Sequence, residues 1–324
     1  MLTGLFRVGH SVLASFMILL GLLAGCAGDA GTPLRVGTNI WIGYEPLYLT
    51  RHLQYLDEDQ VHLVEFTSNT DSIHAFRQGV LDAAALTLDE AFRLADQGVA
   101  FRIVLVMDIS SGADVILANP AIRDVADLRG QRIGVESTAV GAYMLSRALE
   151  KSGLSLQDVE LVPLEITEHA AAFAAGSVDA LVTFEPVRSK LLRQGAQQLF
   201  ASSEIPDEIV DVLIVRPEVL SEREDDVREL LRGWFRSLSY LDQHHDEALA
   251  AMEQRMGLDS VSIAASLDGV LFASIEKNRE MLAGDNPLLV RNGRQLLAHM
   301  VKKRMIRQEF AIEPLLSVDL LQGL

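Results

Sequence analysis

The sequence predicts an α/β protein built as two doubly wound lobes, joined by a hinge of two chain crossings and followed by a helical C-terminal segment. Three observations lead to this prediction. Similar segments recur at a spacing of about 97 residues, each copy alternates apolar strands with helix-length connections, and strand-like segments stand between the copies and after the second. A chain of 324 residues that is 49% hydrophobic is long enough for two domains of ordinary size.

The duplication rests on three pairs of segments in the same order. Residues 35–37 match residues 132–134, residues 61–64 match 159–162, and residues 75–83 match 172–180. Generic strand–helix units also resemble one another, so a true duplication and a shared layout both remain open. Under either interpretation the two halves have the same order of elements.

Each half is expected to contain three strands and two helices. In the first half the strands are 34–40, 61–66 and 83–86, and the helices are 46–56 and 71–78. In the second half the strands are 132–135, 159–164 and 180–183, and the helices are 140–152 and 168–175. Continuous apolar strands with helical connections are typical of parallel sheets that are covered on both faces.

The crossings and the C-terminal segment complete the layout. Strand-like linkers are expected at 102–108, 114–118 and 210–215, and helices at 223–242, 261–282 and 290–301. We therefore expect lobe 1 to comprise residues 34–112 and 213–324, and lobe 2 to comprise residues 113–212.

The first residues have the pattern of an export signal. Arg7 precedes a mainly apolar stretch, residues 8–23, that is short for a membrane span. It ends in Leu-Ala-Gly-Cys, which resembles the lipobox of bacterial lipoproteins. This resemblance implies a signal peptide at 1–25, lipidation of Cys26 and a tether at 26–33.

Composition limits the function further. The net charge of −17 disfavours nucleic acid and anionic membranes as partners. Cys26 is the only cysteine, so no intramolecular disulfide forms. Phosphate-loop, dinucleotide-binding, nucleophile-elbow and zinc-protease motifs are missing. We therefore predict a monomer that is not an enzyme and uses no cofactor and no metal.

Several motifs resemble one family. They are Trp-Ile-Gly-Tyr-Glu-Pro-Leu-Tyr-Leu at 41–49, Gly-Val-Leu-Asp-Ala-Ala at 79–84, Gly-Ala-Asp-Val-Ile-Leu at 112–117, the run from Val125 to Val135, and Thr-Phe-Glu-Pro at 183–186. Together the chain resembles the substrate-binding proteins of ABC importers, in the branch for taurine, aliphatic sulfonates, nitrate and thiamine-pyrimidine precursors. The resemblance implies a type II-like periplasmic binding protein fold that closes on a small molecule like a Venus flytrap.

Ligands of open α/β sheets bind beyond the carboxyl ends of the strands, which selects the loops of lobe 1 that follow its strands. Trp41 and Tyr44 offer an aromatic wall there, although Trp41 is equally interpretable as core. Glu45 either contacts the ligand or starts a helix with Pro46. Further candidates follow the next two strands and are Ser68, Asn69, Thr87 and Asp89. Asp71 is expected to cap the helix after Asn69, and Asp89 is also a candidate cap.

The remaining candidates lie in lobe 2 and at the first crossing. Glu136 and Thr138 precede a helix whose free N–H groups suit an anion, or Thr138 is only its N-cap. Glu185 follows the last strand of the repeat. Asp108, Ser110 and Ser111 lie where the chain first changes lobes, so they are ligand contacts or hinge residues.

The charge of these loops predicts the class of ligand. They contain nine acidic residues and no lysine or arginine. Acidic and aromatic groups together favour an amine-bearing heterocycle, such as a pyrimidine vitamin precursor, over taurine or nitrate. The predicted partners are this ligand and an ABC permease. Presentation of the closed form to a membrane sensor is the alternative.

Overall fold

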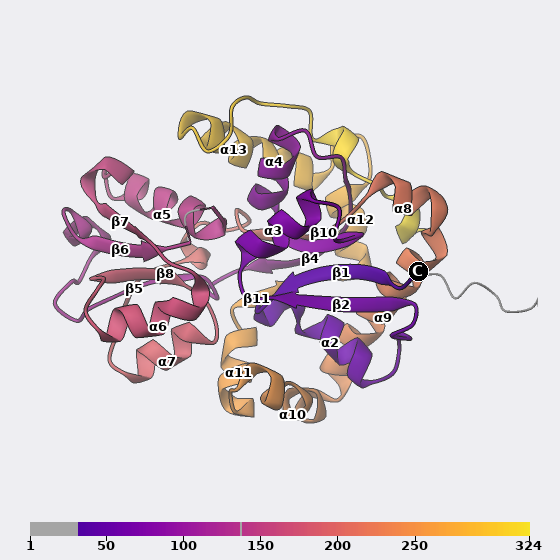
Figure 1. The fold of residues 1–324 in the computed structure, drawn as a ribbon, viewed down its shortest axis with the longest axis horizontal. Coiled ribbons are helices and arrows are strands. Elements are labelled where there is room, and N and C mark those ends of the chain that lie inside the picture. The colour runs from indigo at the N-terminus through magenta and orange to yellow at the C-terminus, as the bar shows by residue number, and fades with distance from the viewer. Residues whose placement is uncertain (1–31, 137) are drawn as a thin grey trace, which may run out of the picture. The chain divides into compact units, whose positions relative to one another are not determined.

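The computed structural model describes residues 32–136 and 138–324, and Leu34–Leu324 form one compact unit. The predicted signal peptide at 1–25, Cys26 and most of the tether at 26–33 lie outside the described residues. Two separate sheets, each with helices on both faces, make up the compact unit (Figure 1). The predicted fold class is confirmed.

The first sheet has six strands in the order β11-β4-β10-β3-β1-β2. Their bounds are β1 Leu34–Asn39, β2 Val61–Phe66, β3 Ala83–Thr87, β4 Arg102–Ser110, β10 Val210–Val215 and β11 Val270–Phe272. The helices α3 (Asn69–Arg77) and α4 (Leu88–Asp96) lie on one side of this sheet, and α2 (Glu45–His52), α9 (Glu224–Gln243) and α10 (His245–Met256) lie on the other (Figure 1).

The second sheet has five strands in the order β7-β6-β8-β5-β9. Their bounds are β5 Val115–Ala118, β6 Arg132–Val135, β7 Glu160–Pro163, β8 Ala180–Thr183 and β9 Gln197–Ala201. The helix α5 (Val140–Lys151) covers one side, and α6 (Ile166–Ala174) and α7 (Val187–Arg193) cover the other (Figure 1).

Both sheets are mixed, whereas the sequence predicted parallel ones. β1 is parallel to β2 and β3, and β6 is parallel to β7 and β8. β10 is antiparallel to β3 and β4, and β5 is antiparallel to β8 and β9. The antiparallel strands flank the crossings, because a chain that leaves a sheet and later returns re-enters it in the opposite direction.

The two crossings are tied together. Between β4 and β5, Ser110 Oγ lies 2.8 Å from Ser202 Oγ, which follows β9. The backbone N–H of Ser202 donates to the carbonyl of Asp114 at 2.9 Å. All of β10 belongs to the first sheet, so the chain has returned to lobe 1 before Val210. This return lies a few residues before the predicted boundary at 212/213.

The C-terminal segment differs from the single helix predicted at 261–282. It contains α11 (Ser260–Leu267), the short strand β11 and α12 (Ile275–Leu282), after α8 (Pro217–Glu222) and before α13 (Leu288–Lys302). Gly269 allows the break, since a Cβ there would collide with the backbone of Ala113 at 2.8 Å. β11 therefore adds to the free side of β4, beside the first crossing.

Candidate functional site

Four neighbouring strands of the first sheet place polar side chains at the same end of the sheet. Asn39 and Thr87 are the last residues of β1 and β3. Asp211 of the antiparallel β10 is paired with Thr87 on one side and with Asp108 of β4 on the other. Because paired residues on adjacent strands share a face, Thr87, Asp211 and Asp108 form a polar row across the centre of the sheet.

Asp108 and Asp211 are two buried carboxyl groups directly opposite each other. Asp108 is 0% exposed and Asp211 is 2% exposed. Burial raises the pKa of Asp108 to about 7. Burial and the Asp108 charge together raise the pKa of Asp211 well above its usual range. Like charges opposite each other on paired strands repel, so a bound proton or cation would stabilise this pair.

The pair has few partners of its own. The Tyr44 hydroxyl donates to Asp211 Oδ1 at 2.5 Å. Asp211 Oδ2 and both Asp108 carboxylate oxygens make no hydrogen bond of good geometry among the described residues. The Trp41 indole N–H and the Asp211 carboxyl nevertheless lie close enough to Asp108 to lower its pKa in part against the effect of burial. A Cβ on Gly43 would collide with both the Trp41 indole nitrogen and the Asp108 carboxylate, so glycine is required for the two groups to approach here.

A small cavity lies against these residues and takes walls from both lobes. Asp114 lines it from the first crossing segment and Val140 and Phe184 line it from lobe 2, opposite the residues of lobe 1, which are Asn39, Trp41, Tyr44, Asn69, Thr87 and Asp211. It encloses about 10 Å³, which is room for the centre of one water-sized sphere. The Trp41 and Phe184 rings meet edge to face with centroids 5.6 Å apart and close one side.

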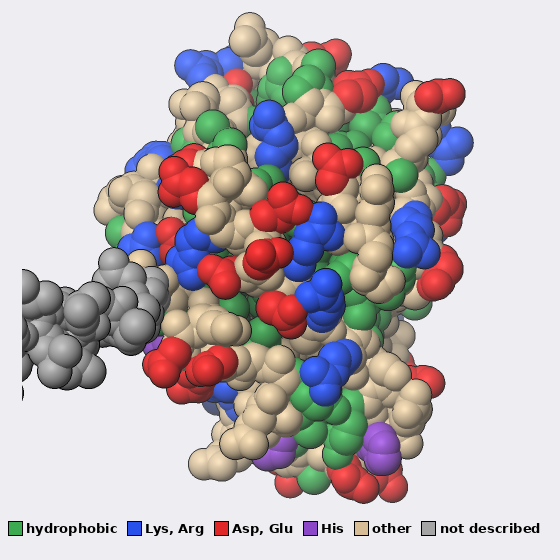
Figure 2. All heavy atoms as spheres, turned by 90° about the vertical axis from the view of Figure 1, so that its right-hand side faces the viewer, with side chains coloured by type: hydrophobic (Ala, Val, Ile, Leu, Met, Phe, Trp, Pro, Cys, Tyr) green, Lys and Arg blue, Asp and Glu red, His purple; other side chains and the backbone are tan. Residues whose placement is uncertain are grey.

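The electrostatics of this cavity favour positive charge or hydrogen-bond donors. No lysine or arginine is among its lining residues. Burial raises the pKa of Asp114, on its wall, to about 6. Partnerless acceptor oxygens remain on Asn39, Asn69 and Asp211, whereas the partnerless donor beside them is the indole N–H of Trp41. On the outer face shown in Figure 2, by contrast, acidic and basic side chains are interspersed.

Hydrogen bonds between the lobes surround the cavity. Glu90 of α4 accepts from the Asn69 side chain at 2.7 Å and from the backbone N–H of Val140, the first residue of α5, at 3.2 Å. The hydrogen-bond acceptor that this helix start requires is therefore supplied by lobe 1 itself. Burial and the neighbouring Asp89 raise the pKa of Glu90 to about 8.

A second set of contacts lies at the rim. Thr70 donates to the predicted residue Glu136 through its backbone N–H at 2.9 Å and its hydroxyl at 2.6 Å. The Thr70 and Thr138 hydroxyls lie 2.5 Å apart. Glu136 and Thr138 thus hold the lobes together, and neither lines the cavity.

Four of the predicted contacts lie on the cavity and one adjoins it. Trp41, Tyr44, Asn69 and Thr87 line it, and Asp108 lies beside Trp41 and Asp211. Ser110 and Ser111 are in the hinge, where the Ser111 N–H donates to the carbonyl of Gly269.

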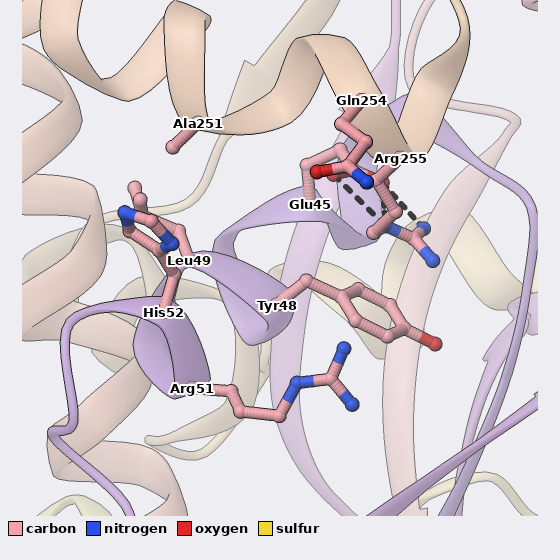
Figure 3. Close-up of a pocket in the computed structure, with 8 residues that line it drawn as sticks. All are labelled: Glu45, Tyr48, Leu49, Arg51, His52, Ala251, Gln254 and Arg255. Atoms are coloured by element: carbon pink, nitrogen blue, oxygen red, sulfur yellow. Dashed lines mark hydrogen bonds and ion pairs between the residues drawn. The ribbon is translucent and has the colours of Figure 1, made fainter.

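The other predicted contacts have structural partners elsewhere. Glu45 is ion-paired with Arg255 of α10, in a surface pocket that also contains Tyr48 and Arg51 (Figure 3). Ser68 caps α3 by accepting from the N–H of Asp71, so the predicted cap at Asp71 is wrong. The reason is that α3 begins at Asn69, two residues earlier than predicted.

Asp89 and Glu185 are likewise internal. Asp89 accepts from the Thr87 hydroxyl at 2.8 Å and lies 3.8 Å from Arg93. Glu185 accepts from the backbone N–H and the hydroxyl of Ser189 and from Arg188, at the start of α7.

The predicted contacts do not include five residues that line the cavity, which are Asn39, Asp114, Val140, Phe184 and Asp211. Asp211 matters most because it is a buried acid. The rule of carboxyl strand ends selects loops after parallel strands, and Asp211 is at the amino end of an antiparallel one. A signal was present, because Asp211 is the only charged residue in the apolar run Val-Asp-Val-Leu-Ile-Val. A lone carboxylate inside a buried strand is rare without a function.

Residues 32–136 and 138–324 contain neither a metal-binding cluster nor a membrane-spanning helix. Within them no group of three or more His, Cys, Asp or Glu side chains has the geometry to hold a metal ion. None of their helices is long and apolar enough to cross a membrane.

Comparison with known proteins identifies a family and a related binding protein. The model of the NMT1-like family matches residues 28–255. A protein of Escherichia coli (strain K12) that is named as an aliphatic sulfonates-binding protein is 24% identical over 237 residues, which cover 70% of this chain and 74% of that protein.

Solved structures show the same fold. The alkanesulfonate-binding protein SsuA from Xanthomonas axonopodis pv. citri, bound to MOPS, superposes with a TM-score of 0.77 at 20% identity, covering 90% of this chain and 100% of that one. The desulfurization enzyme DSZB superposes with a TM-score of 0.63 at 17% identity, covering 89% of this chain and 97% of that one. Because binding proteins and an enzyme share this fold, the fold alone does not assign the activity.

Proposed function

The chain belongs to the NMT1-like family, and from that premise we propose that it is an exported solute-binding protein that captures a small organic molecule between two lobes and delivers it to an ABC importer. The related sequence from E. coli is named as a binding protein, which supports binding without turnover. The alternative of a closed form that signals to a membrane sensor uses the same capture step.

One observation carries the proposal. Residues of both lobes enclose a cavity beside the buried Asp108–Asp211 pair, and Asp211 Oδ2 on its wall makes no hydrogen bond of good geometry, so a ligand between the lobes would satisfy a group that the protein leaves unsatisfied. A ligand that contacts both lobes stabilises the closed arrangement more than an open one. The paired crossings at Ser110 and Ser202 are the natural axis for that movement.

We propose that the ligand bears an amine, as in an amine-bearing heterocycle. An ammonium group would compensate the Asp108–Asp211 pair and donate to the Asp211 oxygen that has no partner. Trp41 and Tyr44 would bound it with aromatic surface, where cation–π attraction adds to the binding.

A sulfonate is the second candidate ligand. The names of the relatives favour it, and so does Arg93 of α4, whose Nε and Nη2 are buried without a hydrogen-bond partner in the described part of the chain. Arg93 lines a separate pocket of about 140 Å³ together with His74, Arg77 and Thr138. Asp89 Oδ2 lies only 3.8 Å from Arg93 Nε, which offsets this charge and leaves the amine as our first choice.

The export of the protein is proposed to end in a lipid anchor on Cys26. The support is the lipobox-like sequence before this cysteine, which lies outside the described residues. The small and turn-rich residues 27–33 would then act as the tether.

Mass spectrometry of the small molecule released from the denatured protein tests the proposal directly. Calorimetric titration with aminopyrimidines and with taurine or alkanesulfonates then compares the two ligand classes. We expect tight binding of an amine, lost in Asp211→Asn and kept in Asp242→Asn, an exposed control on α9. Binding of sulfonates alone, lost in Arg93→Gln, would support the second candidate instead.

A further inference from the structure

An apolar groove lies at the outer mouth of the cleft and is lined by both lobes. Its apolar side chains are Ile40, Ile166, Pro186, Val187, Met256 and Leu258, and its volume is about 320 Å³. Ile40, Met256 and Leu258 belong to lobe 1, whereas Ile166, Pro186 and Val187 belong to lobe 2. Closing the lobes therefore forms this groove.

The groove adjoins the acidic cavity. Ile40 stands between Asn39 and Trp41, which both line the cavity, so one short segment lines both spaces. Trp41 and Phe184 also pack in the same apolar cluster as Ile166, Met256 and Leu258. The Trp41–Phe184 edge contact is thus the partition between an inner polar space and an outer apolar one.

The sizes of the acidic cavity and the apolar groove imply that different parts of a ligand bind in each. The cavity of about 10 Å³ admits a group no larger than a water molecule, and an ammonium group has that size. The carbon skeleton of any larger amine must therefore pass between Trp41 and Phe184, so these rings have to separate when such a ligand binds. The groove there offers apolar side chains and about thirty times the volume.

Charge sets the orientation. Lys190 and Arg193 of α7 stand at the groove and would repel a cationic head, whereas Asp211 and Asp114 on the cavity wall would attract it. A ligand with one amine is therefore held with its head inward and its apolar body in the groove.

We propose that the groove lined by Ile40, Ile166, Val187, Met256 and Leu258 is a second subsite, which binds the apolar body of an amine whose head occupies the acidic cavity. This inference rests on the proposed function, because it presumes capture of an amine between the lobes. It predicts a preference for amines with an aliphatic or aromatic body over small hydrophilic amines.

A homologous series of primary amines tests the subsite. Calorimetric titration with propylamine, butylamine, pentylamine and hexylamine should show an affinity that rises about fourfold for each added methylene, as burial of a CH₂ group implies. The head group is the same throughout, so the gain reports only on the body.

A matched pair of variants locates the effect. Val187 is half-buried at the start of α7 on the groove, and Val261 of α11 is 80% exposed and does not line the groove. We expect Val187→Asn to weaken hexylamine binding about tenfold and to change propylamine binding less than twofold. Val261→Asn should change neither.

The outcomes separate the subsite from the proposed function. Amines that bind with one affinity at every chain length would overturn the groove as a subsite while amine capture stands. If none of the amines binds, both the subsite and the proposed ligand class are overturned. Equal losses of hexylamine affinity in both variants would also overturn the subsite.

Discussion

Asp108→Asn should stabilise the ligand-free protein above neutral pH. The substitution keeps the size of the side chain and removes a charge that is fully buried and opposite Asp211 on the neighbouring strand. The asparagine amide would also donate to the Asp211 carboxylate, which replaces a repulsion by a hydrogen bond.

The magnitude follows from the pKa of Asp108, which burial raises from its ordinary value of 3.8 to about 7. Ionisation in the folded state is therefore disfavoured, so the free energy of unfolding falls as the pH rises from about 4 to about 7 and stays low above that. A gap of about three pH units corresponds to about 4 kcal/mol as an upper bound, at 1.36 kcal/mol per unit. After relaxation of the surroundings we expect about 2 kcal/mol.

Thermal unfolding at pH 8 and at pH 5 measures this effect. At pH 8 the variant should melt about 4 °C or more above the wild type, and at pH 5 the difference should shrink. Asp242→Asn, an exposed control, should melt with the wild type at both pH values. The hypothesis of an unpaired buried charge is refuted if Asp108→Asn is no more stable than the wild type at pH 8. It is also refuted if the difference in melting temperature between the two proteins does not depend on pH.

Four further predictions concern the ligand and the anchor. Amine affinity should fall as the pH drops below about 6, because protons then compete for Asp114 and Asp108, whose pKa values burial raises to about 6 and about 7; affinity that is constant from pH 8 to pH 5 argues against carboxylate binding. Trp41→Ala should weaken ligand binding tenfold or more, as removal of a buried aromatic contact implies, and a drop in melting temperature alone would make Trp41 a core residue. Small-angle scattering should show a smaller radius of gyration at saturating ligand, and an unchanged radius would contradict lobe closure. Cys26→Ser should release the protein or leave an unprocessed precursor, and a processed, membrane-bound form would exclude the lipid anchor.

Much of the secondary structure could be predicted because it depends on local pattern. The strands at 61–66, 132–135, 180–183 and 210–215 have the bounds that were predicted. Their apolar runs end at turn residues, which a sequence shows directly. The helix expected at 261–282 failed because helical periodicity does not reveal that β11 can pair with β4, a segment about 160 residues away.

The site was only partly predictable. Trp41, Tyr44, Asn69 and Thr87 were found because they follow or end strands whose direction the pattern implied. Asp211 was not, because its position depends on β10 running antiparallel between β3 and β4. Glu45 was expected either at the ligand or at a helix start, and α2 does begin at Glu45. Its ion pair with Arg255, 210 residues away in sequence, could not be expected because such proximity is a tertiary property.

The sequence by itself determined that this is a two-lobed α/β protein with acidic loops, because hydrophobic periodicity, turn residues and repeated segments are local features of the chain. Only the tertiary structure decided which acids face one another. The register of β4, β10 and β3 places Asp108 beside Asp211, and the packing of Trp41 against Phe184 across the lobes separates their cavity from the apolar groove. Strand direction and interlobe packing minimise the free energy of the whole chain, so no single segment carries the information about them.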